Sequence, residues 1–262
     1  MKSIVVITTD SGIKRNFANL LATETNGAVK CVIIQKVPPK FLIKKISSFI
    51  KKIGLINTIS ETFYFLLNKS PKNKEVLAWF KERTANSENE KDWLAPIKVV
   101  SDINSDESYL FLQNINPDII VIWGGSILKK RILDLAKYCL NIHSGVAPLY
   151  RGVSCNQHAI LNNDFSNIGI TIHYANKQVD SGDIIEIIKA KTNQRPKECF
   201  KQLNDEALDK YKAVIKSILM DKKIEGASQN LSSGQQYLLK DWGFKKDFQL
   251  VKKLLEWDKL NL

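Results

Sequence analysis

The sequence predicts an α/β fold with a mostly parallel β-sheet, and three observations support this prediction. Short segments that are apolar throughout recur along the chain, as in parallel strands buried on both faces. Amphipathic segments with helical periodicity lie between them, which is the order of βαβ units. The loop Asp10–Gly12 follows the first apolar segment, at the sheet edge where open α/β folds bind ligands.

The individual elements follow from these patterns in chain order. We expect strands at residues 3–9, 29–35, 97–100, 119–123, 139–143, 168–173 and 183–188. We expect helices at residues 14–23, 75–83, 104–113, 128–136, 154–161, 203–220 and 248–257, and a strand or extended arm at 235–242. This order predicts a core domain over residues 1–190 and a small, mainly helical extension over residues 191–262.

Residues 36–74 read as a basic insertion in the core domain. They hold nine Lys and one Glu, which supplies +8 of the formal net charge of +12. Apolar residues recur at helical spacing between residues 40 and 67, with lysines on the other face. Such a helix suits an anionic membrane surface or a phosphorylated acceptor. We favour the plainer alternative, in which its apolar face packs on the domain, and both alternatives stay open.

The composition is that of a soluble globular protein. Of the 262 residues, 44% are hydrophobic and 25% charged, and no apolar stretch approaches the ~20 residues needed to span a bilayer. The N-terminal apolar segment is too short for a signal peptide, so we expect a cytoplasmic protein. The four cysteines lie far apart without a Cys-x-x-Cys pair, which indicates neither a zinc site nor a disulfide framework.

Three side chains suit acyl-transfer chemistry. Asn141 and His143 are two residues apart at the end of an apolar segment, so in a strand they share one face. An amide can donate to a developing oxyanion, and an imidazole handles protons near pH 7. Asp180 precedes Ser181 and Gly182 in a turn and can return to orient the histidine or relay a proton. On spacing alone, this is one of many possible triads.

The surrounding motifs are more specific. The chain reads Asn-x-His at 141–143, Pro-x-x-Arg-Gly at 148–152 and Asp-Ser-Gly-Asp-Ile at 180–184. In this order the three pieces resemble the folate-dependent formyltransferase family, most closely its nucleotide-sugar N-formyltransferases. The resemblance implies a Rossmann-like formyltransferase core and transfer of a formyl group from 10-formyltetrahydrofolate to a primary amine. It also implies that Asn141, His143 and Asp180 are catalytic and that no metal takes part.

The resemblance further suggests where the donor and the acceptor bind. The residues expected to contact the folate are Ser126, Ile127, Leu128, Tyr174, Val179 and Asp183. The residues expected to contact the acceptor are Ser11, Gly12, Tyr150, Arg151, Gly152 and His158. His158 stands where many relatives carry a Trp, which puts the acceptor in question and not the reaction. We interpret His173, on a neighbouring strand, as a structural histidine.

The acceptor is chosen by elimination. A methionyl-tRNA formyltransferase would carry an additional C-terminal β-barrel, whereas residues 191–262 look mainly helical. Glycinamide ribonucleotide formyltransferases are usually shorter and lack such an insertion. A dTDP- or UDP-linked amino sugar for cell-surface polysaccharide, such as lipopolysaccharide, is therefore the predicted partner, and nucleic acid is not expected. These two rejected acceptors, hydrolysis of 10-formyltetrahydrofolate and folate binding without turnover stay as alternatives. The apolar C-terminal helix suits a homodimer interface or internal packing equally well.

Overall fold

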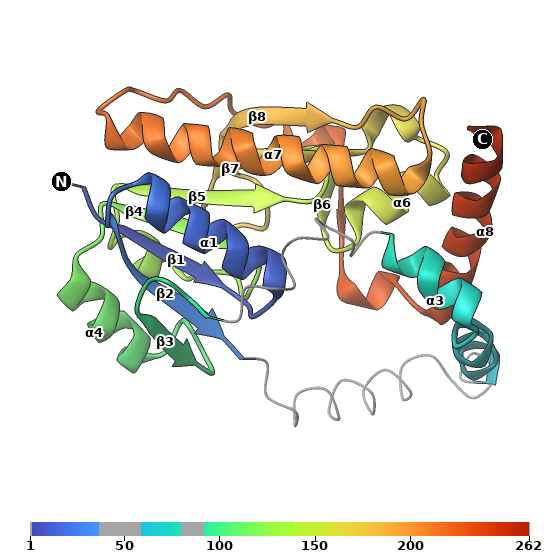
Figure 1. The fold of residues 1–262 in the computed structure, drawn as a ribbon, viewed down its shortest axis with the longest axis horizontal. Helices are drawn as coiled ribbons and strands as arrows, with labels where there is room; N and C mark the ends of the chain where they lie inside the picture. The colour runs from blue at the N-terminus through green and yellow to red at the C-terminus, as the bar shows by residue number, and fades with distance from the viewer. Residues whose placement is uncertain (1, 37–58, 80–91, 262) are drawn as a thin grey trace.

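A seven-stranded sheet forms the centre of the computed structural model, which describes residues 2–36, 59–79 and 92–261 (Figure 1). The strand order is β3-β2-β1-β4-β5-β7-β8. The strands are β1 (Ile4–Thr8), β2 (Val29–Gln35), β3 (Ile97–Val100), β4 (Ile119–Trp123), β5 (Tyr138–His143), β7 (Gly169–Tyr174) and β8 (Ile184–Lys189). The first five are parallel, and β7 is antiparallel to both of its neighbours. The predicted, mostly parallel α/β fold is therefore confirmed.

The strand order changes direction at β1, whose two neighbours are β2 and β4. From there the sheet grows through β2 to β3 on one side and through β4 to β5 on the other. The loops after β1 and β4 therefore leave the sheet edge on either side of a topological switch point. Open α/β sheets bind ligands in this crevice.

Helices cover both faces of the sheet, which explains why its central strands are apolar throughout. Ile4 and Val6 of β1 pack in one apolar cluster with α1 (Gly12–Glu24) and α7 (Pro196–Leu219). Val5 and Ile7 point the other way, toward α4 (Asp106–Ile115) and α5 (Lys130–Leu133). All four of these β1 side chains are buried. Figure 1 shows α1 and α7 lying along the same face of the sheet.

Helix boundaries differ from the sequence prediction where capping outweighs periodicity. The sequence predicts helices at 203–220 and 75–83, but α7 begins at Pro196 and α3 (Pro71–Ala78) begins at Pro71. Both prolines occupy the first helical turn, where the missing N–H costs nothing and the fixed φ suits the helix. The helix predicted at 128–136 is reduced to the four residues of α5.

Helix α7, which covers one face of the sheet, lies beyond the domain boundary predicted at residue 190. The Tyr211 side chain of α7 is fully buried, and its hydroxyl donates a hydrogen bond of 2.8 Å to Leu140 O of β5. The same hydroxyl accepts a hydrogen bond of 3.3 Å from Ile122 N of β4. Residue 190 is therefore not a break in packing, because α7 belongs to the core that covers the sheet.

The segment after α7 returns to the sheet edge and ends in a helix. β9 (Gln235–Tyr237) pairs in parallel with β6 (Tyr150–Gly152), and α8 (Phe244–Leu260) follows. Four apolar side chains of α8 are buried within the chain itself: Leu250, Val251, Leu254 and Trp257. Of the two alternatives for this helix, the structure therefore supports internal packing.

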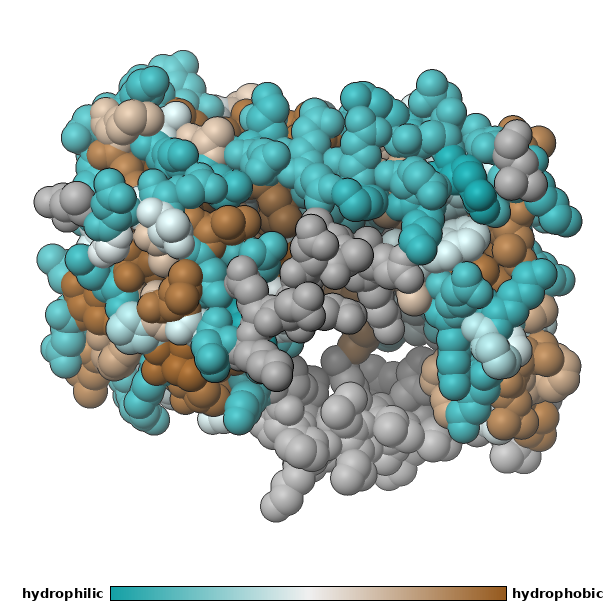
Figure 2. All heavy atoms as spheres, in the orientation of Figure 1, coloured by the Kyte–Doolittle hydropathy of each residue, from teal (hydrophilic) through white to brown (hydrophobic). Residues whose placement is uncertain are grey.

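The C-terminal end of the basic insertion packs against α8. Residues 59–68 are helical, and their ring contacts are Tyr64 with Phe248 (5.5 Å between centroids) and Phe65 with Phe244 (4.9 Å). Figure 2 shows apolar side chains gathered over this end of the molecule and a hydrophilic surface over α7. The helix predicted from residue 40 onward lies outside the described residues up to residue 58.

The cysteines are free and buried, as predicted. Burial raises the pKa of Cys139 and of Cys199 to about 12, so both stay protonated as small apolar side chains. Within residues 2–36, 59–79 and 92–261, no helix combines the length and the apolar character needed to cross a membrane.

Tyr211→Phe tests the contribution of α7 to the core. The variant loses the buried hydrogen bonds to Leu140 O and Ile122 N, so we expect a decrease of about 1–2 kcal/mol in the free energy of unfolding. Urea unfolding measures this free energy, and its dependence on the urea concentration (the m value) should stay unchanged. Tyr109→Phe is the matched control, because the half-buried Tyr109 ring contacts the Arg131 guanidinium and Phe keeps this ring contact. An equal, negligible effect of both changes would contradict this role of Tyr211.

Candidate active site

Two polar side chains of β5 share one face at the carboxyl end of the sheet. Asn141 and His143 are two residues apart, so the pleat directs both to the same side. The antiparallel strand β7 places His173 opposite Asn141 and Thr171 opposite His143. Thr171 Oγ1 donates a hydrogen bond of 2.7 Å to Gly145 O, which holds the turn that follows β5.

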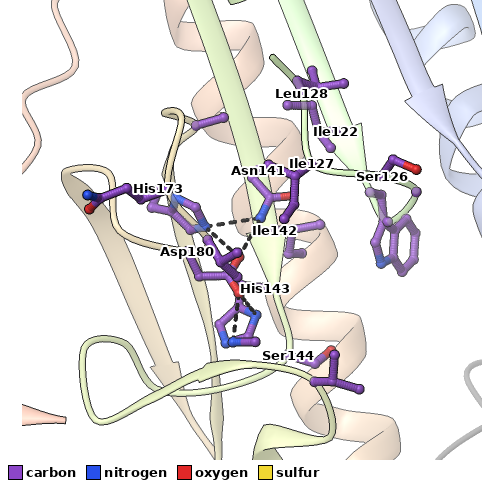
Figure 3. Close-up of a pocket in the computed structure, with 18 of the residues that line it drawn as sticks. Ile122, Ser126, Ile127, Leu128, Asn141, Ile142, His143, Ser144, His173 and Asp180 are labelled. Atoms are coloured by element: carbon purple, nitrogen blue, oxygen red, sulfur yellow. Dashed lines mark hydrogen bonds and ion pairs between the residues drawn. The ribbon is translucent and has the colours of Figure 1, made fainter. Parts of the chain in front are cut away.

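The Asp180 carboxylate contacts both of these side chains (Figure 3). Its Oδ2 lies 3.2 Å from His143 Nδ1, and its Oδ1 accepts a hydrogen bond of 3.2 Å from Asn141 Nδ2. The Gly152 N–H also donates to Oδ2, at 2.9 Å. Asp180 has a φ of +45°, a left-handed conformation that Asp tolerates better than most residues. The three predicted catalytic side chains therefore form one connected group.

His173 belongs to the same group, although the sequence suggested only a structural role. Its Nδ1 faces the Tyr174 carbonyl at 2.8 Å and must donate to it, so Nε2 of the neutral ring is an acceptor. Asn141 Nδ2 lies 3.0 Å from this Nε2 and donates to it. The two amide hydrogens of Asn141 thus serve His173 and Asp180, which fixes the orientation of the amide (Figure 3).

His143 is 6% exposed, and each of its ring nitrogens faces an acceptor. Nε2 donates a hydrogen bond of 2.9 Å to Tyr150 O, and Nδ1 faces Asp180. Burial lowers the pKa of His143 below its ordinary value, against the attraction of the Asp180 charge. The neutral ring therefore lacks one of the two protons that its surroundings accept. If His143 takes up a proton, the imidazolium can donate to both Tyr150 O and Asp180.

Asp180 is held in its charged form. Burial disfavours the charge, but the neighbouring His173 and His143 rings and the Gly152 N–H outweigh it and hold the pKa of Asp180 below its usual value. A buried carboxylate surrounded by donors is a stable anion near neutral pH. The site therefore combines an ionised acid with a neutral imidazole.

A residue far along the chain fixes the Asp180 turn. Gln229 Nε2 donates to the carbonyl oxygens of Asp180 (3.1 Å) and Gly182 (2.6 Å). Gly182 is required because a Cβ there would lie 1.8 Å from Tyr174 O. Nothing in the sequence pattern marks Gln229, since it belongs to an irregular segment 47 residues after Gly182.

Gly145 and Gly152 explain the glycines of the first motif. A Cβ on Gly145 would lie 2.5 Å from His143 Nε2, so only glycine leaves room for the imidazole. Gly152 has a φ of +99°, and a Cβ there would lie 2.1 Å from the carbonyl oxygen of Tyr237 in β9. Its close approach to β9 is what directs its N–H toward Asp180.

A cavity of about 470 Å³ opens beside the connected side chains. Asn141, His143 and Asp180 all line it. Of the other residues predicted from the resemblance, five also line it: Ser126, Ile127, Leu128, Gly152 and Val179. The structure thus brings the predicted catalytic group and the predicted folate loop to one cavity.

The remaining predicted residues lie off the cavity wall: Ser11, Gly12, Tyr150, Arg151, His158, Tyr174 and Asp183. Ser11 precedes the first turn of α1. The Tyr150 hydroxyl donates to Asp164 Oδ2 at 2.9 Å, and that of Tyr174 donates to Ile224 O at 2.7 Å. In the described structure, therefore, these side chains support the surroundings of the cavity and do not form its surface.

His158 is buried in an aromatic stack and does not reach the cavity. Its ring stacks on Tyr237 with 3.9 Å between centroids, and Trp242 meets it edge-on at 4.8 Å. It is 4% exposed, and its Nε2 has no hydrogen-bond partner. The residue that replaces the Trp of many relatives therefore anchors the C-terminal segment on α6 (Cys155–Leu161).

Sequence reasoning missed two parts of the cavity wall. Lys14 lines it from the first turn of α1, with Nζ 5.9 Å from the Trp123 ring centroid. Residues 236–239 line it from β9 and the turn after it. The switch-point rule could have found Lys14, because the residue follows the loop after β1. Pairing between β6 and β9 has no signature in a single sequence.

Metal binding has no support among the side chains that the structure places. Within the described ranges, no three His, Cys, Asp or Glu residues gather in a way that would hold a metal ion.

The sequence matches a family model described as formyl transferase over residues 69–219. A curated relative, methionyl-tRNA formyltransferase of Thermotoga neapolitana, is 32% identical over 149 residues, which are 52% of this chain and 46% of the relative. The chain thus spans about half the length of the curated relatives it matches.

Solved structures are similar over nearly the whole chain. A sugar N-formyltransferase from Shewanella sp. has a TM-score of 0.56 at 13% identity, covering 97% of this chain and 88% of that one. The N-formyltransferase from Helicobacter canadensis, in complex with folinic acid and dTDP-3-aminofucose, has a TM-score of 0.55 at 17% identity, covering 97% and 81%. At these identities the likeness establishes the fold, and it confirms the predicted Rossmann-like formyltransferase core.

The stability of the C-terminal packing should depend on pH through His158. Burial and the Lys246 ammonium lower the pKa of His158 from 6.5 to about 4, against the opposing charge of Asp241. Between these two values the unfolded chain binds a proton that the folded protein does not, so stability is lost as the pH falls. His158→Phe keeps the stack without this proton. Melting temperatures between pH 7 and 4.5 should therefore fall more steeply for the wild type, and parallel curves would refute the idea.

Proposed function

The chain belongs to the formyl transferase family, and from this premise we propose that it transfers a formyl group from 10-formyltetrahydrofolate to a primary amine. One observation carries the proposal: the connected group of Asn141, His143 and Asp180 on the wall of one cavity. These residues come from β5 and from the loop between β7 and β8, and they supply an amide donor, a proton acceptor and a fixed carboxylate.

The cavity suits the folate donor. Ile122, Leu128 and Val179 give it apolar surface, and the segment 126–128 brings backbone polar groups to the same wall. A flat heterocycle with apolar faces and a hydrogen-bonding edge matches such a wall. When bound, the donor supplies the formyl group that the amine attacks.

His143 and Asp180 handle the proton. As the neutral acceptor amine attacks, its nitrogen becomes acidic, and His143, a neutral imidazole in the cavity wall, takes up the proton. Asp180 stabilises the resulting imidazolium from 3.2 Å, and the Tyr150 carbonyl stabilises its other nitrogen. The ring then returns the proton to the departing folate nitrogen, so that His143 ends the reaction neutral, as it began.

Asn141 supports the negative charge that develops on the formyl oxygen. Its two amide hydrogens are held by His173 at 3.0 Å and Asp180 at 3.2 Å. The longer contact is the one to be exchanged for the formyl oxygen, while His173 keeps the amide in place. Pre-aligned donors of this kind are among the largest contributions to acyl-transfer catalysis.

For the acceptor we propose a nucleotide-linked amino sugar, dTDP- or UDP-linked, formylated in the cytoplasm for cell-surface polysaccharide. Its supports are the fold similarity to sugar N-formyltransferases over 97% of the chain and the cavity wall formed by residues 236–239. Lys14 offers a positive charge on the same wall to a phosphate of the acceptor.

Methionyl-tRNA is the second candidate acceptor. Two curated relatives named for it are 32% and 36% identical to this chain, over 52% and 49% of its length. These partial matches favour formyl transfer as the reaction. They leave about half of the chain unmatched, so they support the choice of acceptor less than the reaction.

His143→Ala and Asp180→Ala should each lower turnover by at least ~100-fold. The first variant removes the proton acceptor, and the second leaves His143 without the carboxylate that stabilises its charged form. Formation of tetrahydrofolate in the presence of donor and acceptor measures the rate. Asp258→Ala, which removes an ion pair with Arg195 on the surface, is the control and should keep the wild-type rate. Near wild-type rates in either active-site variant would sink the mechanism.

A panel of acceptors tests the proposed substrate. Donor is mixed with dTDP- and UDP-linked amino sugars, glycinamide ribonucleotide or methionyl-tRNA, and initial rates are compared. We expect at least one nucleotide amino sugar to react ~100-fold faster than the other acceptors. Preference for methionyl-tRNA would overturn the acceptor assignment and leave formyl transfer intact. Release of formate without any amine would identify a hydrolase instead.

A further inference from the structure

The loop that lines the folate side of the cavity has no secondary structure of its own. Residues 124–129 connect β4 to α5, and Gly124 and Gly125 have φ values of +75° and +102°. Ile127 at its centre is 57% exposed, so packing of this side chain does not fix the loop. Its position must come from other contacts.

Gln35 supplies two of these contacts from the end of β2. Its side-chain Oε1 accepts a hydrogen bond of 2.8 Å from Ser126 N, and its Nε2 donates one of 2.8 Å to Ser126 Oγ. Gln35 is 8% exposed. A buried amide with both ends satisfied is a rigid connection, because moving the loop would leave its polar atoms without partners.

The connection reaches across a strand. β1 lies between β2 and β4 in the sheet, so the Gln35 side chain must pass over the end of β1 to meet the loop after β4. Gly125 makes this approach possible, because a Cβ there would lie 3.1 Å from Gln35 Oε1. The second glycine of the loop thus admits the Gln35 side chain.

Asn104 holds the other end of the loop. From the turn before α4, its Nδ2 donates a hydrogen bond of 3.0 Å to Ile127 O, and its Oδ1 accepts one of 2.7 Å from Lys129 N. Asn104 is also 8% exposed. Gln35 and Asn104 together therefore bind three backbone groups of the segment 126–129, which are Ser126 N–H, Ile127 C=O and Lys129 N–H, and also the Ser126 hydroxyl.

We propose that Gln35 and Asn104 are positioning residues that hold the segment 126–129 in the conformation that binds the folate donor. The inference rests on the proposed function, since it concerns the donor side of the same cavity. A loop that is already ordered loses less conformational freedom when the ligand binds. Neither side chain lines the cavity, so both act through the backbone that does.

Steady-state kinetics separate this role from a general contribution to stability. Gln35→Leu and Asn104→Leu remove the hydrogen bonds at similar volume, and each should raise the KM for the donor by ~10-fold. The KM for the acceptor and kcat should change by less than ~3-fold, because the catalytic group is untouched. Ser126→Ala removes one of the two Gln35 contacts and should raise the donor KM less than Gln35→Leu does.

The matched control is Asn167→Leu. Its amide donates two hydrogen bonds to Asp164, away from the cavity, so this variant should lose stability without a change in the donor KM. If the loop variants lower only the melting temperature, or raise both KM values equally, the positioning role is wrong.

Binding of folinic acid keeps the test independent of turnover. If the wild type binds folinic acid in calorimetry but shows no formyl transfer, the proposed function fails, while ~10-fold weaker binding by the two Leu variants still supports the positioning role. Equal affinity of wild type and variants, or no binding by the wild type, would overturn it.

Discussion

The rest of the site depends on the contacts of the Asp180 carboxylate with His143, Asn141 and the Gly152 N–H. The carboxylate lies within 3.2 Å of His143 Nδ1 and Asn141 Nδ2, and the Gly152 N–H donates to it. A buried charge is tolerated only where donors replace water, so β5, the motif loop and the Asp180 turn must meet at one point. The Gln229 side chain holds the turn by donating to the carbonyl oxygens of Asp180 and Gly182. Because Asp180 stays ionised, it offers a negative charge to His143 whenever the ring is protonated.

The sheet was predictable because each of its strands carries its own signal. The strands at 29–35, 97–100 and 119–123 agree with the structure residue for residue, since each is an apolar-rich segment bounded by polar or turn-forming residues. The helices were less predictable at their ends. Pro196 and Pro71 start α7 and α3 before the apolar periodicity does. The predicted boundary at residue 190 missed the packing of α7 for a related reason, because tertiary contacts such as those of Tyr211 leave no local pattern.

The candidate catalytic group was predictable from the sequence, whereas the residues that hold it in place were not. Asn141, His143 and Asp180 stand in motifs that resemble a known family, and the structure brings them together. His173 contacts two of them, yet a histidine on a strand gives no sign of which side chains lie across the sheet. Gln229 reaches the turn from an irregular segment. Interactions made by antiparallel register or by long loops are set by the whole fold and not by neighbouring residues.

The division of the cavity wall explains why the motifs indicate a reaction more clearly than an acceptor. The proton-handling side is built from β5, the motif loop and the Asp180 turn, which lie within or beside the motifs. The opposite side includes residues 236–239, which are held in place by pairing of β9 with β6 and by the stack of Tyr237 on His158. The stack requires an aromatic partner for Tyr237 on α6, and the backbone pairing with β6 requires no particular side chains. Neither contact imposes a sequence motif on residues 236–239. Under the proposed function, the sequence of this segment can change with the acceptor while the stack and the β6 pairing keep it at the cavity.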